Sequence, residues 1–417
     1  MKKDWLLFAA IVLLTGIGLA TLYSTTIADE NVISGGGIMN SQLIFVLIGI
    51  TVYFLVTLFD YKYITYPQFF LPVYVLVLIG LILVLLVGVE VNYAKRWITF
   101  AGVGIQISEF AKLAVIIVTA GLFALRNRFN VWILAILSFL ATMTMAGLVF
   151  VEPDASTAIL ICIIWFCMAY TALPGQARNL IFLILMILSA LVLNSFLYGN
   201  MTAFVVLIGL CILTLIVSYF IFHKINFGFI AAVVIGLVIG IAGNLAWENI
   251  LQDYQKQRIE SFINPSEDVR GSGFQVAQSK VAIGSGMLFG KGFGQGTQSK
   301  LRFLPEHQTD FIFAAFAEEF GLIGAMFLLG IYAFTVFRII KWANAIKCVF
   351  GSLVCIGVAG KFLSEIFINV GMNLGVVPAT GIPLPLMSAG GSMLLATMIC
   401  MGLVQSIVVH RDIVDTT

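Results

Sequence analysis

The chain has 417 residues, of which 61% are hydrophobic and only 10% are charged. This balance excludes a soluble globular protein, because too few polar side chains are available to cover a surface in contact with water. The formal net charge of +2, without a basic stripe or a recognised motif, argues against nucleic acid as a partner. Six cysteines without CxxC spacing and three widely separated histidines argue against a disulfide framework and a His-built metal centre.

Apolar runs of about 20 residues recur along the whole chain, which predicts an all-α, polytopic membrane protein. We expect about twelve membrane-spanning helices, at residues 5–23, 42–59, 69–91, 108–125, 131–151, 155–172, 179–197, 201–222, 226–246, 310–338, 347–370 and 388–409. The first run follows Lys2 and Lys3 but is too long for a cleaved signal peptide. Residues 1–417 are therefore predicted to form one integral membrane domain with a large loop at about residues 247–309.

Lysine and arginine residues predict the orientation of these spans through the positive-inside rule. One side carries Lys2, Lys3, Lys62, Arg126, Arg128, Arg178, Lys224, Arg338, Lys341 and Arg411. On the other side, the breaks at residues 24–41, 152–154, 198–200 and 371–387 contain no lysine or arginine. Both termini are therefore expected in the cytoplasm, and the long loop is expected outside it.

Two outward segments carry cations against this preference. Residues 92–107 contain Lys95 and Arg96, and the long loop contains Lys256, Arg258, Arg270, Lys280, Lys291, Lys300 and Arg302. One explanation is a solvated surface of mixed charge, since the loop holds nearly as many acidic residues. The other is a site for an anionic headgroup, such as a pyrophosphate, at the outer membrane face.

The long loop ends in a polar segment, residues 303–313, where the next membrane helix begins. Residues 271–298 before it are rich in glycine, which lets backbone N–H groups approach an anion but is also typical of flexible loops. A carboxylate at Asp310 would lie near a low-dielectric boundary, where it could accept a proton. By position alone, the commoner role of such an aspartate is to cap the helix.

Ionisable residues also fall inside expected spans, where charge is expensive and indicates function. They are Glu109 with Lys112, Glu318 with Glu319, and Lys361 with Glu365. The first and third pairs are spaced to meet on one helix face, and simple mutual neutralisation is the favoured explanation for Lys361 and Glu365. The last outer loop, residues 373–392, contains three prolines and several glycines, which predicts irregular backbone covered by protein. It would be either a wall of a headgroup groove or a stiff connector.

Several motifs, in order along the chain, resemble those of the SEDS family of cell-shape, division and sporulation proteins, whose members include RodA, FtsW and SpoVE. The motifs are Arg96-Trp97-Ile98, residues 106–112, Pro153-Asp154, residues 278–286, residues 305–313 and residues 381–392. Residues 296–299, 303–306 and 380–385 resemble the cell-shape members more than the division members. The resemblance implies peptidoglycan glycosyltransferase activity on lipid II, for cell-wall elongation, in the bacterial cytoplasmic membrane. It also implies a class B penicillin-binding protein and other elongation-complex membrane proteins as partners.

The resemblance assigns roles to named residues. Asp310 matches the essential aspartate of the family, which favours a catalytic group over a helix cap. Arg96, Trp97, Glu109 and Lys112 match positions of the extracytoplasmic site and its supporting salt bridge. The other predicted substrate-binding residues are Asp154, Arg258, Gln278, Ser279, Lys280, Lys291, Gln298, Glu306, Thr309 and Ser388.

The chain also departs from the family pattern. Gln308 stands where a histidine usually precedes Thr-Asp, Ile107 replaces a proline, and Ala389 replaces a tyrosine. Residues 152–157 read Glu-Pro-Asp-Ala-Ser-Thr in place of Gln-Pro-Asp-Leu-Gly-Thr. Since the family fold has ten spans, two of the twelve expected helices would be an insertion between Thr157 and Asp253.

As a hypothesis, Asp310 takes the proton from the 4-hydroxyl of an acceptor GlcNAc as it attacks the anomeric carbon of the donor MurNAc. Undecaprenyl pyrophosphate leaves with inversion and needs no acid to protonate it. Charge stabilisation by Arg96, loop lysines or a divalent cation, Mg²⁺ or Mn²⁺, is then the remaining requirement. The alternatives are a flippase for lipid II or another polyprenyl-linked sugar, a non-catalytic scaffold, and the division or sporulation paralogue of the family.

Overall fold

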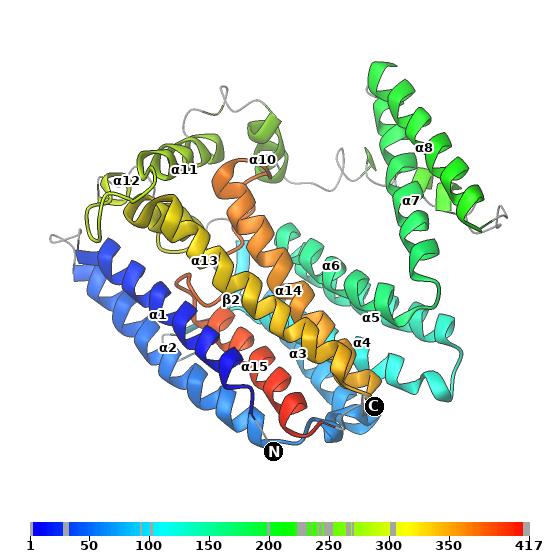
Figure 1. Ribbon diagram of the computed structural model, residues 1–417, viewed down its shortest axis with the longest axis horizontal. Helices are drawn as coiled ribbons and strands as arrows, with labels where there is room; N and C mark the ends of the chain where they lie inside the picture. The colour runs from blue at the N-terminus through cyan, green and yellow to red at the C-terminus, as the bar shows by residue number, and fades with distance from the viewer. Residues whose placement is uncertain are drawn as a thin grey trace. The chain divides into compact units, whose positions relative to one another are not determined.

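The structure is a computed structural model that describes residues 3–27, 33–91, 94–100, 103–197, 201–222, 232–234, 236–238, 240–241, 244–245, 253–263, 268, 271–300 and 306–411. Helices dominate these residues, which confirms the all-α class (Figure 1). The chain divides into two compact units, Met1–Ala172 with Ser261–Thr417, and Leu173–Glu260.

Within the described residues, nine helices are long and apolar enough to cross a membrane. They are α1 (Trp5–Ile27), α2 (Ile33–Leu58), α3 (Pro67–Val87), α4 (Ile107–Ala124), α5 (Val131–Val151), α6 (Ala155–Ala172), α13 (Ile312–Ala345), α14 (Val349–Leu374) and α15 (Gly391–Val409). Nine of the twelve expected spans are thereby confirmed. Shorter helices join them, namely η1 (Tyr61–Thr65), η2 (Leu125–Asn127), α10 (Asp253–Ile263), α11 (Ser272–Ser285) and α12 (Thr297–Lys300).

The second unit contains two further helices. These are α7 (Gln176–Leu197) and α8 (Met201–Phe222), at the positions expected for spans 179–197 and 201–222. They pack together through a small core in which Leu215 lies against the buried Ile181 and Leu185. Both fall within the stretch where two additional helices were expected. The expected span at residues 226–246 lies largely outside the described residues.

The interior of the first unit is formed by α4, α14 and α15, which are its most buried spans. Figure 1 shows α15 running alongside α2, with α1 next to α2 and to α13. Small residues allow this close approach, because a Cβ atom at Gly357 of α14 would lie 2.7 Å from Met168 Sδ and 2.9 Å from Ile116. Small residues at contacts are typical of membrane helices, whose association depends on close packing rather than on exclusion of water.

A small antiparallel sheet precedes α4, where the sequence predicted only a loop. Its strands are β1 (Val89–Val91), β2 (Ala94–Phe100) and β3 (Val103–Ile105), in the order β1-β2-β3. Val89 pairs with Trp97, and Ile98 pairs with Ile105. The central strand thus carries Arg96 and Trp97, two predicted site residues, on adjacent positions whose side chains point to opposite faces.

Helix α13 is broken at Gly321, which has φ 67° and ψ −167°. Backbone groups freed by the break are satisfied by residues 287–292 of the preceding loop. Leu322 N–H donates to the Met287 carbonyl at 2.8 Å and Ile323 N–H to the Leu288 carbonyl at 3.2 Å. In the other direction, Lys291 and Gly292 N–H groups donate to the carbonyls of Glu318 and Glu319, both at 3.0 Å. The loop therefore docks into the break, because unpaired backbone groups at membrane depth are costly.

Replacing Gly321 should undock this loop. In Gly321→Ala a Cβ atom would lie 2.3 Å from Gly290 N and 2.6 Å from the Leu288 carbonyl carbon, at a positive φ that alanine disfavours. We expect the free energy of unfolding to fall by about 1–3 kcal/mol, with faster proteolysis of residues 271–300. Thermal unfolding in detergent and limited proteolysis would measure both effects.

The matched control is Gly330→Ala on the same helix, where a Cβ atom meets nothing within 4 Å. Alanine is the better helix former, so the control should match or slightly exceed the wild-type unfolding temperature. Equal losses in both variants would contradict the docking role of Gly321.

Candidate functional site

Asp310 lies in the turn that leads into α13, where α14 fixes its backbone. The Asp310 carbonyl accepts hydrogen bonds from the side-chain amides of Asn369, at 2.9 Å, and Asn373, at 3.1 Å. The Asn373 side-chain oxygen also accepts from Ala314 N–H at 3.2 Å, in the first turn of α13. The N-cap position of α13 belongs to Phe311. The structure thus places Asp310 one residue before the cap and holds it from α14.

The loop of residues 373–392 lies beside this turn. The Ser388 hydroxyl donates to the Thr309 carbonyl at 2.6 Å, and Ala389 N–H donates to the Gln308 carbonyl at 2.9 Å. Asn369 also donates to the Ile382 carbonyl at 2.8 Å. Three hydrogen bonds thus join this loop, called the wall loop below, to the Asp310 turn or to Asn369, which holds that turn.

Helix α11 covers α13 and α14 at the same end. Buried Ala282 packs against Phe311 and Ala314, which flank the start of α13. The Ser279 hydroxyl, which is fully buried, donates to the Asn373 carbonyl at 2.9 Å. Lys280 is exposed and Gln278 is partly exposed. Among these predicted site residues, Lys280 and Gln278 are accessible to a ligand, whereas Ser279 joins α11 to α14.

A second cluster surrounds the turn between α5 and α6. An Arg96 side-chain N–H donates to the Pro153 carbonyl. The carboxylate of Asp154 accepts from Thr157 N–H at 3.2 Å, which caps α6, and from the Gln106 side-chain amide at 3.3 Å. The Ser156 hydroxyl donates to the Thr380 carbonyl at 3.0 Å. Since Thr380 belongs to the wall loop, this bond connects the Arg96 cluster with the loop that flanks Asp310.

Glu318 holds the loop of residues 291–298 to α13, and Glu319 joins α13 to α1. Glu318 is fully buried and pairs with Lys291 at 2.6 Å, and it accepts from Thr297 N–H at 2.8 Å and Gln298 N–H at 3.2 Å. Glu319 accepts a hydrogen bond from the Ser24 hydroxyl of α1. Lys291 and Gln298 were predicted to bind substrate, and the structure gives both a contact that anchors the loop.

Four buried charges form one network within the membrane interior. Lys112 Nζ lies 2.8 Å from Glu109 and 2.7 Å from Glu365, and Lys361 Nζ lies 2.8 Å from Glu365. The two pairs expected within helices are therefore present, and the Lys112–Glu365 contact joins them across α4 and α14. Lys361 also donates to the Thr397 hydroxyl of α15 at 3.2 Å. Because these side chains are almost completely buried, Glu109 and Lys112 support the site from within rather than facing a ligand.

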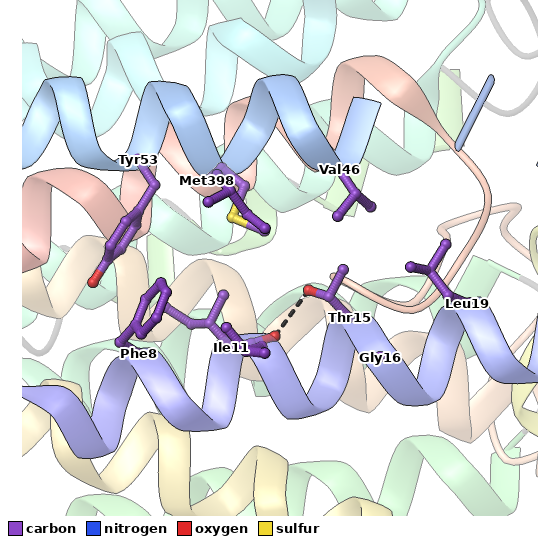
Figure 2. A pocket seen from close by; sticks show the side chains of 10 residues that line it. Phe8, Ile11, Thr15, Gly16, Leu19, Val46, Tyr53 and Met398 are labelled. Atoms are coloured by element: carbon purple, nitrogen blue, oxygen red, sulfur yellow. Dashed lines mark hydrogen bonds between the residues drawn. The ribbon is translucent and has the colours of Figure 1, made fainter. Parts of the chain in front are cut away.

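The apolar cavity shown in Figure 2 is a different place. It has a volume of about 150 Å³ and lies between α1 and α2, with Met398 of α15 at its wall. Two of its lining side chains carry a hydroxyl group, Thr15 and Tyr53, and that of Thr15 donates back to the Ile11 carbonyl at 2.8 Å. A sugar or phosphate needs several polar partners, so this cavity does not suit the headgroup of a lipid-linked sugar.

Comparison with known proteins identifies the family. The sequence profile of the FtsW/RodA/SpoVE family, described as cell cycle proteins, matches residues 4–209 and 177–413. The chain belongs to this family, the SEDS family. Peptidoglycan glycosyltransferase RodA of Treponema pallidum is 32% identical over 97% of both chains, and peptidoglycan glycosyltransferase MrdB of Escherichia coli is 34% identical over 82% of this chain and 78% of its own.

The solved structures agree with the SEDS fold. A chain from a structure described as "Structural coordination of polymerization and crosslinking by a peptidoglycan synthase complex" matches with a TM-score of 0.69 and 24% identity, over 98% of both chains. The family and the nine spans together make this chain a multi-pass membrane protein.

Three further predicted site residues of this SEDS protein are Arg258, Glu306 and Thr309. Arg258 lies in α10 within the second unit and is described there by itself. Glu306 is exposed and accepts from the Thr309 hydroxyl at 2.9 Å. Glu306 and Thr309 therefore belong to the turn that contains Asp310, and their contact with substrate is still a prediction. Sequence reasoning missed Asn369 and Asn373, although amides inside an apolar span are a signal of function.

Among the residues that the structure describes, no three His, Cys, Asp or Glu side chains are grouped to hold an ion. A divalent cation at this SEDS site would therefore take most of its ligands from substrate phosphate and water, as Mg²⁺ commonly does.

Removing the central charge of the network should destabilise the protein. Glu365→Gln leaves Lys112 and Lys361 without their shared carboxylate in a site that excludes water. Breaking a buried ion pair by removing one partner costs about 3–5 kcal/mol, so we expect a large drop in unfolding temperature. The control is Glu260→Gln, an exposed carboxylate, for which a change within about 0.5 kcal/mol is expected. A Glu365→Gln protein as stable as this control would show that the network contributes nothing to stability.

Proposed function

We propose that this chain polymerises lipid II into glycan strands for cell-wall elongation and cell shape, with Asp310 as the general base. The enzyme class, peptidoglycan glycosyltransferase, follows from the family and its curated relatives. The observation that carries the role of Asp310 is the way its backbone is held. Two side-chain amides of α14 donate to its carbonyl and fix the residue just before the start of α13, beside the wall loop. Such a fixed position is what a general base needs in order to meet one hydroxyl group.

The reaction requires one proton acceptor and one site of positive charge. Asp310 would take the proton of the GlcNAc 4-hydroxyl while the oxygen forms a bond to the anomeric carbon of MurNAc. The bond from that carbon to the pyrophosphate oxygen breaks, and undecaprenyl pyrophosphate departs with the electron pair, which inverts the anomeric centre. A pyrophosphate does not need the second carboxyl group that glycosidases use to protonate an alcohol.

Arg96 is the cation best placed to meet the leaving group. It lies on β2, and its contact with the Pro153 carbonyl uses one terminal N–H. A guanidinium has further donors in a planar arrangement that matches phosphate oxygens. Exposed Lys280 on α11 offers a second charge. A Mg²⁺ or Mn²⁺ ion would supply further neutralisation of the phosphates, and this cofactor remains a prediction.

The setting proposed is the bacterial cytoplasmic membrane, with both termini in the cytoplasm, as the positive-inside rule predicts. The proposed partners are a class B penicillin-binding protein, which would crosslink the strand, and other membrane proteins of the elongation complex. The similarity in fold to a chain from a peptidoglycan synthase complex supports the first partner. The elongation role rests on residues 296–299, 303–306 and 380–385, and the division or sporulation role is its alternative.

A flippase is less well supported than an enzyme. A lipid flippase needs polar groups along a route through the bilayer. The four charges buried in α4 and α14 instead neutralise each other in one network of Glu109, Lys112, Lys361 and Glu365. The other predicted site contacts gather at the Asp310 end of the helices.

The test is polymerisation by Asp310→Asn. Asparagine keeps the size of the side chain but cannot accept the proton, so we expect glycan polymer from labelled lipid II to fall at least about 100-fold. The assay uses purified protein with its penicillin-binding partner. Equal polymer from variant and wild type would remove Asp310 from the mechanism, and headgroup translocation in liposomes without polymer would favour the flippase.

The matched control is Asp60→Asn, at the other end of the helices. Ser388, just before α15, bonds to Thr309, whereas Ser406, near the end of α15, bonds to the carbonyl of Phe59. Asp60 accepts from Lys62 N–H at 3.0 Å, a bond that asparagine can also accept. We therefore expect wild-type polymer yield from this control.

A further inference from the structure

Glu152 is a buried carboxyl group that the mechanism above does not use. It follows α5 directly and begins the turn that contains Pro153 and Asp154. Its side chain is fully buried, and neither carboxyl oxygen has a hydrogen-bond partner among the described residues. An ionised carboxylate in this position would be far more costly than a neutral one, because desolvation acts chiefly on charge.

The surrounding charges act on Glu152 in opposite directions. Burial is the largest effect and the neighbouring Asp154 carboxylate the second, and both raise the pKa of Glu152, whereas Arg96 lowers it. The result is a pKa of about 8, well above the ordinary value of 4.5. Glu152 is therefore predominantly protonated at neutral pH.

The other elements packed near this turn supply groups that are neutral or already paired. The relevant residues are Gln106 and the Glu109–Lys112 pair on α4, Tyr74 on α3 with its hydroxyl bonded to Ala141 and Thr144, Ser156 on α6, and Thr380 in the wall loop. Arg96 and Asp154 are the charged side chains whose fields act on Glu152.

We propose that Glu152 is a positioning residue that works in its neutral form, and that its ionisation withdraws Arg96 from the anionic part of the substrate. With Glu152 neutral, Arg96 and Asp154 sum to zero and the guanidinium keeps its contact with the Pro153 carbonyl. With Glu152 ionised, the cluster carries one net negative charge. Arg96 would then pair with the new carboxylate, and the cluster would repel a pyrophosphate.

A protonated glutamate has nearly the same shape as glutamine and, like glutamine, carries no charge. Glu152 thus behaves as a glutamine below its pKa and as an anion above it. Because this inference rests on the proposed function, its test must separate a failure of Glu152 from a failure of that function.

The first test compares polymerisation by wild type and Glu152→Gln at different pH values, with the same partner protein and labelled lipid II. A single group of this pKa predicts that wild-type activity falls about tenfold between about pH 7 and about pH 9. Glu152→Gln should be active at neutral pH and should change less than about twofold over the same interval. Glu260→Gln, at an exposed carboxylate, should keep the wild-type profile. Parallel profiles for wild type and Glu152→Gln would overturn the proposal.

The second test needs no catalysis. Since folding raises this pKa, the folded state binds the proton more tightly, and stability should decline as pH rises from about 4.5 to about 8. Glu152→Gln should lose this part of the pH dependence of unfolding. If the wild type makes no polymer at any pH but the unfolding curves differ in this way, the proposed function fails while Glu152 is still a neutral buried acid.

A third measurement uses the wild type alone, in case the variant does not fold. An infrared difference spectrum between neutral and alkaline pH should show the loss of a protonated carboxyl band as Glu152 ionises. Absence of such a band at neutral pH would overturn the proposal.

Discussion

The arrangement around Asp310 depends on the pairing of one buried carboxylate, Glu365, with two lysines, one on α4 and one on α14. Glu365, Asn369 and Asn373 lie four residues apart and form one polar face of α14. The ion pairs with Lys112 and Lys361 make it possible to bury the charged end of this face. The two asparagines continue it to the carbonyl of Asp310. One face of α14 thus connects the charge network in the membrane interior with the backbone of the candidate catalytic residue.

Backbone groups rather than side chains make many of the contacts that gather the site. Gln308 and Ala389 both depart from the family pattern, and they meet through the N–H of one and the carbonyl of the other. Ser388 and Ser156 likewise donate to main-chain carbonyls. The position of Asp310 is therefore compatible with these substitutions, because the bonds at positions 308 and 389 do not depend on which side chain is present.

The sequence predicted the spans and the intrahelical pairs because both follow from local periodicity. Glu109 with Lys112 and Lys361 with Glu365 are close by helix geometry alone. The contact between Lys112 and Glu365 depends on how α4 packs against α14, which no spacing along the chain specifies. The sheet of residues 89–105 was missed because its strands are short and follow a long apolar run. Lys291 and Gln298 looked like binding residues because the partner that holds them, Glu318, is distant in sequence.

The prediction that Asp310 could cap a helix was also based on local sequence alone. The sequence placed an aspartate at a helix start, where capping is the common role, but it could not reveal that Asn373 approaches Ala314 from another helix. Periodicity could have shown Asn369 and Asn373 as a continuation of the Glu365 face. The four-residue spacing predicted the Lys361–Glu365 pair but was not extended to the two asparagines.

The break in α13 separates the helix into two rods. The inner rod, residues 322–345, is about 36 Å long at 1.5 Å per residue and is sufficient to cross the hydrocarbon core by itself. The outer rod, residues 312–320, carries Asp310 at its tip and is fastened to α11 and α14. Residues 287–292 bond to the backbone of both rods, so the bend at Gly321 is held at a fixed angle by the docked loop. The direction in which the outer rod carries Asp310 therefore depends on a segment that lies more than fifteen residues earlier in the chain.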